Sequence, residues 1–152
     1  MFNVVLIEPE IPPNTGNIGR LCLATGSTLH LVKPLGFSIG DRELRRAGLD
    51  YWKEVDVRLW DSLEDLRQSE NLAARFFFLT TKSDRAYYDV GFQSGDFLVF
   101  GRETKGLPEP LLAANQEHLL TIPMQGARSL NLATAVAIVL FEAVRQQRAR
   151  PV

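Results

Sequence analysis

This 152-residue chain has one cysteine, a small net charge and no long apolar run. Each of these features excludes a class of protein. The single cysteine, Cys22, rules out an internal disulfide framework and fits a reducing compartment. The formal net charge of −1 means that any binding of nucleic acid must come from local clusters of Lys and Arg. No stretch reaches the ~18–20 apolar residues of a membrane span, and no signal peptide is recognisable. We therefore expect a cytoplasmic protein with no membrane partner.

Potential metal ligands are equally sparse, because the chain has only two histidines. His30 and His118 stand in strand-like segments with no cysteine or carboxylate at ligand spacing, so we expect no metal site. Hydrophobic residues make up 45% of the chain and charged residues 23%, which is ordinary for a globular protein. Length and composition together predict a single domain over residues 1–152.

Short apolar runs bounded by Pro or Gly predict buried strands of a parallel sheet, because they are hydrophobic on both faces. Helix-like patterns lie between these runs, and the alternation predicts a doubly wound α/β sheet. The expected strands are Asn3–Ile7, Leu29–Val32, Phe76–Thr80, Phe97–Phe100 and His118–Ile122. The expected helices are Asn17–Thr25, Arg42–Ala47, Ser62–Glu70, Glu109–Asn115 and Leu130–Gln147.

The last expected helix is apolar around most of its circumference, which is more than one domain face can cover. We therefore expect a homodimer through this C-terminal helix, and a charged residue at Leu140 should split the dimer or unfold the chain. The alternative is a central core helix with no partner. The apolar stripe comprises Ala133, Val136, Ala137, Leu140, Phe141 and Val144, with Ile138 and Val139 elsewhere on the helix.

Three segments with glycines at sheet-to-helix junctions are candidates for binding. The first, Asn14-Thr15-Gly16-Asn17-Ile18-Gly19-Arg20, allows close backbone approach and offers free N–H groups to an anion. The strict dinucleotide and P-loop patterns are absent. The alternative is structural, with Asn14 or Thr15 capping the helix and Arg20 a surface charge.

The second and third segments each follow an expected strand. They read LVFGRETKGLP over residues 98–108 and IPMQGARSLNLA over residues 122–133. Ligands of open α/β sheets bind beyond the C-terminal ends of the strands, so we expect all three segments to meet at one edge. By themselves, Ser129 and Asn131 also fit the simpler role of helix caps.

In order and spacing, these segments resemble the three motifs of the SpoU branch of the SPOUT methyltransferases, over nearly the whole chain. The matching motifs are N-x-G-N-I-G-R, F-G-x-E-x-x-G-L-P, I-P-M and S-L-N-L. The opening from Glu8 to Asn17 and the segment from Leu44 to Tyr51 resemble small bacterial members that 2′-O-methylate the wobble nucleotide, C or modified U at position 34, of leucine tRNAs. The resemblance implies a parallel-sheet α/β-knot fold with a C-terminal trefoil knot, S-adenosyl-L-methionine as cofactor, and tRNA as partner.

The resemblance also implies which residues form the site. By this resemblance, Arg20 acts on the 2′-hydroxyl and the adjacent phosphate. A guanidinium stays protonated at any pH below ~12, so it is a poor base. We therefore interpret Arg20 as a residue that binds the phosphate and stabilises the developing alkoxide, while a phosphate oxygen or water takes the proton. The residues implied to complete the catalytic site are Asn14, Glu103, Ser129 and Asn131. Those implied to bind the cofactor are Leu79, Thr80, Gly101, Ile122, Ser129 and Leu130.

A cluster of arginines is the expected RNA contact. Arg42, Arg45 and Arg46 share one face of a predicted helix, which suits phosphates; the alternative is a solvated face balanced by acidic neighbours. The family commonly has Tyr before Glu at the end of its third motif, where this chain has Phe141. Two other functions stay open: methylation of another tRNA or rRNA ribose, and RNA binding without turnover.

Overall fold

One parallel sheet of six strands organises the chain, in the order β3-β2-β1-β5-β4-β6. The computed structural model describes residues 1–40, 42–47, 49–126 and 129–149. The strands are β1 (Asn3–Ile7), β2 (Thr28–Val32), β3 (Val57–Trp60), β4 (Phe76–Leu79), β5 (Phe97–Phe100) and β6 (Leu119–Leu120). The α-helices are α1 (Pro12–Thr25), α2 (Arg42–Ala47), α3 (Leu63–Ser69), α4 (Glu109–Ala114) and α5 (Leu132–Ala149), and the 3-10 helices are η1 (Leu49–Glu54), η2 (Tyr87–Asp89) and η3 (Gln116–His118).

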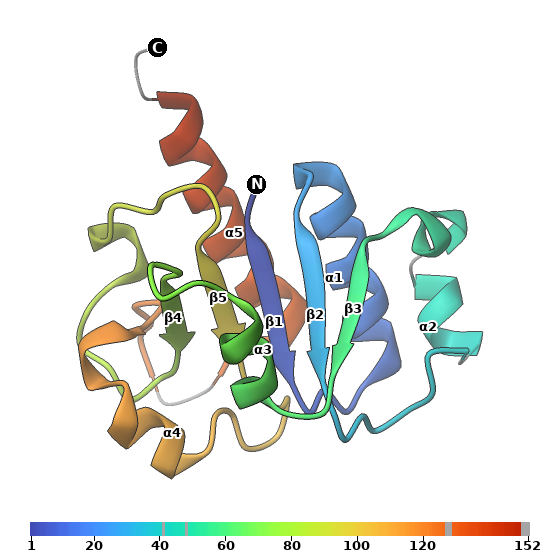
Figure 1. Cartoon of the computed structure of the whole chain (residues 1–152), viewed down its shortest axis with the longest axis horizontal. Helices are drawn as coiled ribbons and strands as arrows, with labels where there is room; N and C mark the ends of the chain where they lie inside the picture. Colours follow the sequence, from blue (N-terminus) through green and yellow to red (C-terminus); the bar gives the residue numbers. More distant parts are fainter. Residues whose placement is uncertain (41, 48, 127–128, 150–152) are drawn as a thin grey trace.

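Helices cover both faces of this sheet, and each face has its own core (Figure 1). In β1, Val4 and Leu6 belong to the core shared with α1 and α5, whereas Val5 and Ile7 belong to the core on the side of α3 and α4. This division follows from the strand itself, because successive side chains point to opposite faces. The predicted parallel α/β class is confirmed. The C-terminal knot stays a prediction.

The pattern does not predict strand β3, and it predicts too late a start for helix α1. Strand β3 is absent from the prediction because it lies at the sheet edge, where Arg58 and Leu59 are exposed and no continuous apolar run marks it. Helix α1 begins at Pro12, earlier than the predicted Asn17. Proline is tolerated in the first helical turn because its missing N–H would have no partner there.

Helix α5 packs one side against the sheet and leaves another side open. Val136, Val139 and Leu140 are fully buried within the chain, whereas Phe141 is 45% exposed. Leu140 is covered by its own domain, so of the two outcomes expected for a charge at this position, burial favours unfolding of the chain. The outward apolar face of α5 centres on Phe141.

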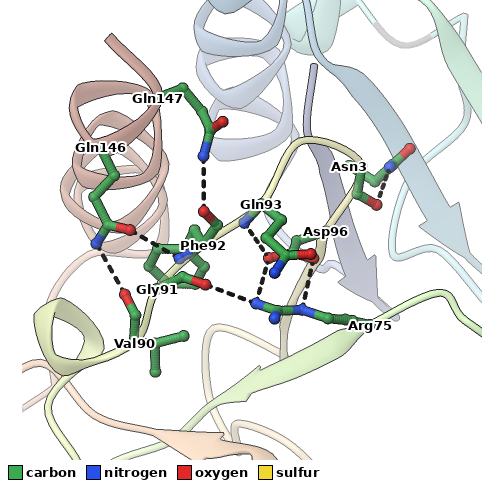
Figure 2. A network of polar contacts seen from close by, with 10 residues as sticks. Asn3, Arg75, Val90, Gly91, Phe92, Gln93, Asp96, Gln146 and Gln147 are labelled. Atoms are coloured by element: carbon green, nitrogen blue, oxygen red, sulfur yellow. Dashed lines mark hydrogen bonds and ion pairs between the residues drawn. The ribbon is translucent and has the colours of Figure 1, made fainter. Parts of the chain in front are cut away.

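Hydrogen bonds fasten the end of α5 to the segment that leads into β5 (Figure 2). The side-chain amide of Gln146 donates to the carbonyl of Val90 and its oxygen accepts from the N–H of Phe92, at 2.9 and 2.8 Å. Gln147 donates to the carbonyl of Phe92 at 2.7 Å. These bonds replace lost water contacts of a loop backbone and hold α5 in one position along the sheet.

Candidate active site

A cavity of about 250 Å³ lies beyond the C-terminal ends of β4, β5 and β6. The loops after these strands meet at the lower edge of the sheet in Figure 1, which is the edge where open α/β sheets bind ligands. All six residues implied to bind the cofactor line this cavity: Leu79, Thr80, Gly101, Ile122, Ser129 and Leu130. The sequence motifs after β4, β5 and β6 therefore meet in one place, as the alternation of strands predicts.

The loop after β5 forms one wall of the cavity as a tight turn. The backbones of Arg102 and Gly106 exchange hydrogen bonds of 3.3 and 2.9 Å, and Gly106 has a φ of 65°, a conformation that suits glycine. A Cβ atom at Gly101 would overlap the backbone of Gly106 and Leu107. Glycine at position 101 is therefore needed for the turn to fold back on itself beside the cavity.

Carboxylates join the loop after β5 to the loop after β1. Glu8 forms an ion pair of 2.7 Å with Arg102, and Glu10 accepts hydrogen bonds from the backbone N–H and the hydroxyl of Thr104. These contacts raise the pKa of Arg102 and lower that of Glu10, through hydrogen bonds to the charged forms. Glu8 has a φ of 52°, a strained value for a residue other than glycine. Strain of this kind is typical of sites where geometry serves function.

Glu103, implied to be catalytic, binds the start of α1. Its carboxylate accepts from the backbone N–H groups of Glu10 and Ile11 at 2.9 and 2.7 Å, and from the amide of Asn14 at 3.3 Å. The N-cap of α1 is Ile11, which has no side chain that could cap the helix. Glu103 thus supplies, from another loop, the negative charge that a helix N-terminus favours.

The same chain of contacts continues to α5. The amide nitrogen of Asn131 donates to the carbonyl oxygen of Asn14 at 3.1 Å, and the carbonyl of Asn131 caps α5 by accepting from the N–H of Thr134 at 3.2 Å. Glu103, Asn14 and Asn131 therefore form one polar relay that joins the N-termini of two helices. Three of the implied catalytic residues are brought together, and the fourth, Ser129, lies in the cavity wall.

Arg20 is the exception, because it is not among the residues that line the cavity. It lies on the exposed side of α1, with its guanidinium carbon 5.9 Å from the centre of the Tyr51 ring. Arg20 makes no hydrogen bond or ion pair with the described part of the chain. The side chain is exposed, so its N–H donors are available to an anion.

The arginines expected to contact RNA lie on α2, which packs against α1. Arg42 and Arg46 are exposed, as a phosphate-binding face requires, and the side chain of Arg45 lies outside what the structure describes. Leu44 is fully buried and anchors the opposite side of α2. The expected division of this short helix into polar and apolar faces is present at the described positions.

The sequence patterns do not predict several of the residues that line the cavity. Lys82 follows β4, lines the cavity and pairs with Glu109 at the start of α4. Thr104 and Lys105 lie in the second motif at positions that the family pattern leaves variable. The ion pair of Glu8 and Arg102 depends on β1 and β5 being neighbours in the sheet. Local sequence patterns do not reveal this strand pairing.

Neither a metal centre nor a membrane segment is found in the described ranges. No group of three or more His, Cys, Asp or Glu side chains in these ranges could hold a metal ion. Likewise, none of their helices is long and apolar enough to cross a bilayer.

The fold and the cavity together define an α/β protein that binds a small ligand at the C-terminal edge of a parallel sheet. A family model described as the SpoU rRNA Methylase family matches residues 1–141. The chain belongs to this family, which confirms the resemblance carried by its motifs.

Individual tRNA and rRNA methyltransferases are similar to this chain over most of its length. The chain is 51% identical over 152 residues to the tRNA (cytidine(34)-2'-O)-methyltransferase of Yersinia pestis, covering 96% of this chain and 94% of the relative. A solved structure that concerns 2-OH methylation of C/U34 on tRNA superimposes with a TM-score of 0.94 at 46% identity, covering 99% of this chain and 98% of that one. An AdoMet-bound rRNA methyltransferase from Sinorhizobium meliloti superimposes with a TM-score of 0.84 at 28% identity, covering 95% of this chain and 56% of that one.

Proposed function

We propose that this protein transfers a methyl group from S-adenosyl-L-methionine to the ribose 2′-hydroxyl of the wobble nucleotide, C or modified U at position 34, of leucine tRNAs. The observation that carries the proposal is the meeting of all six implied cofactor residues in one cavity. Similarity to tRNA methyltransferases over nearly the full length of both chains supports the choice of substrate. We take residues 1–152 to be one catalytic domain that works in the cytoplasm, where it meets tRNA.

The lining of the cavity suits the chemistry of the proposed cofactor. Leu79, Ile122 and Leu130 offer apolar surface to a flat adenine, and Gly101 lines the cavity without a side chain of its own. Ser129 and Thr80 add hydroxyls at the rim. When bound, S-adenosyl-L-methionine supplies an activated methyl group on a sulfonium centre.

The chain's own task is then to orient the 2′-hydroxyl and to manage its proton. Arg20, which has no hydrogen-bond or ion-pair partner among the described residues, binds the phosphate next to the target ribose and stabilises the oxygen as it loses its proton. The relay of Glu103, Asn14 and Asn131 fixes the ends of α1 and α5, which carry Arg20 and the wall of the cavity. A phosphate oxygen or a water molecule accepts the proton.

We further propose that the active form is a homodimer through α5. The outward face of this helix carries Phe141, which is 45% exposed, and a second copy would cover it. Helix α1 contacts α5 within the chain. Arg20 does not line the cavity of its own chain, and we propose that it acts at the cavity of the second copy. Arg42, Arg45 and Arg46 provide further contacts to the tRNA backbone.

Nucleoside mass spectrometry of tRNA incubated with the protein and S-adenosyl-L-methionine tests the function directly. We expect one added methyl group on the ribose of nucleotide 34 in leucine tRNAs. Methylation at another position would replace the proposed substrate, and cofactor binding without any transfer would make the protein a non-catalytic relative.

The variant Arg20→Ala isolates the proposed mechanism. We expect it to abolish methylation while the affinity for S-adenosyl-L-methionine stays within a few-fold of the wild type, because Arg20 lies outside the cavity. Normal turnover by this variant would remove Arg20 from the mechanism.

A further inference from the structure

Two consecutive residues of η1 rest on two consecutive residues of α1. Trp52 covers Gly19 so closely that a Cβ atom there would lie 2.7 Å from the Cζ3 atom of the indole ring. Tyr51 precedes Trp52 in η1, and Arg20 follows Gly19 in α1. The guanidinium carbon of Arg20 lies 5.9 Å from the centre of the Tyr51 ring. The Trp52 contact therefore sets the position of η1, and with it the position of Tyr51.

The contact with Tyr51 has an unusual consequence for Arg20. Among the described residues, Arg20 has no hydrogen-bond acceptor and no ion-pair partner. The Tyr51 ring is therefore the one polar or aromatic group among them that contacts the guanidinium. A carboxylate would hold the guanidinium by occupying its N–H donors, whereas an aromatic ring attracts the cation and leaves those donors free. The side chain is thus restrained while its capacity to bind an anion is intact.

The side chain of Tyr51 contributes little to the packing of the fold. Its side chain is 47% exposed and belongs to neither core, whereas Trp52 is half-buried and packs against the core that α1 shares with the sheet. The two neighbours have separate tasks, because Trp52 anchors η1 and Tyr51 touches Arg20. Removing the Tyr51 ring should leave the fold intact.

We propose that Tyr51 is a positioning residue for Arg20, holding the guanidinium in place before the RNA phosphate arrives. The proposal rests on the function proposed for Arg20 and adds a residue to it. A free arginine side chain loses rotational freedom when it binds, and restraint in advance lowers that cost in the transition state. The motif from Leu44 to Tyr51, which the cavity does not use, receives a role in this way.

The test compares Tyr51→Phe and Tyr51→Leu in steady-state methylation of tRNA. Because a cation–π contact at an exposed site is worth about 0.5–1 kcal/mol, which corresponds to about a two- to fivefold change in rate, we expect Tyr51→Leu to lower kcat by that factor. Tyr51→Phe keeps the ring and should stay within twofold of the wild type. The dissociation constant of S-adenosyl-L-methionine and the melting temperature should not change. Tyr88→Leu, at a tyrosine that is 54% exposed on η2, is the matched control and should have no effect.

Gly19→Ala perturbs the same contact without altering Tyr51. The added methyl group displaces Trp52, which shifts η1 and its tyrosine away from Arg20. We expect a loss of kcat similar to that of Tyr51→Leu, and the double variant should lose no more than either single one, because both remove one interaction.

Three results would overturn the proposal. These are wild-type kcat in Tyr51→Leu, an equal loss in Tyr51→Phe, which would assign the effect to the hydroxyl, and additive losses in the double variant. Failure of the proposed function is seen separately, as absence of methylation at nucleotide 34 by the wild-type protein. Normal turnover by Arg20→Ala would remove the residue that Tyr51 is proposed to position.

Discussion

Acid should destabilise this protein through His30, a fully buried histidine in the middle of β2. Its Nδ1 accepts a hydrogen bond from the indole N–H of Trp60 at 3.0 Å, and its Nε2 lies 2.9 Å from the side-chain oxygen of Asn3, to which it donates. Both ring nitrogens are thus used by the neutral form, and a second proton would face the Trp60 donor. Burial, followed by the positive charge of Arg58, lowers the pKa of His30 from 6.5 to about 4.

The sign of the effect follows from which state binds the proton. Between pH 6.5 and pH 4 the unfolded chain protonates His30 and the folded chain does not, so stability is complete above pH 6.5 and falls as the pH decreases. From pH 7.5 to pH 5.5 the loss in the free energy of unfolding is about 1.4 kcal/mol. Carboxylates such as Glu142, whose pKa is lowered from 4.5 mainly by its hydrogen bond from Arg145, contribute mainly below this window.

Urea denaturation at pH 7.5 and pH 5.5 measures this loss, with His30→Gln as the control. The glutamine variant is less stable at both pH values, but its stability should change little between them, because the titrating group is gone. An equal loss of stability with pH in the variant and in the wild type would refute the assignment to His30.

Three further substitutions and one chemical modification test the cavity, the dimer and the core. Gly101→Ala should lower the affinity for S-adenosyl-L-methionine at least tenfold by calorimetry, because the new Cβ atom overlaps the backbone of the adjoining turn; unchanged affinity would place the cofactor elsewhere. Phe141→Asp should yield a folded monomer in analytical ultracentrifugation, whereas Leu140→Asp should unfold the chain, because Leu140 is fully buried within it. The thiol of Cys22, whose pKa burial raises to about 12, should react with Ellman's reagent only after unfolding.

Buried strands were predictable because their residues are apolar on both faces. The run Asn3–Ile7 is both the predicted and the observed strand β1, and Phe97–Phe100 likewise matches β5. Strand β3 was not predictable from such a run, because it is an edge strand with an exposed Arg58. The family motifs predicted which residues would meet at the cavity, although the periodicity of the sequence could not give the order of the strands.

The division of roles within the site was the least predictable part. Sequence motifs group Arg20 with Asn14, but six residues along a helix turn the two side chains to different directions. The structure accordingly puts Asn14 in the relay with Glu103 and leaves Arg20 exposed. The burial of Leu140 and the exposure of Phe141 depend in the same way on the rotation of α5, which a helix with apolar residues all around does not reveal.

The carboxylate of Glu103 has hydrogen bonds that suit a positioning role, and one variant distinguishes this role from that of a base. Three donors already bind it, two of them backbone N–H groups at the start of α1, where negative charge is favoured. Glu103→Gln should lower kcat about tenfold or more, since hydrogen bonds to a charged group are worth about 1.5–3 kcal/mol. If the carboxylate only holds α1 in place, the shape of the pH–rate profile should be the same in the variant and in the wild type. Loss of the acidic limb of that profile in Glu103→Gln would instead identify Glu103 as the proton acceptor, and the role given to the phosphate oxygen or water would be wrong.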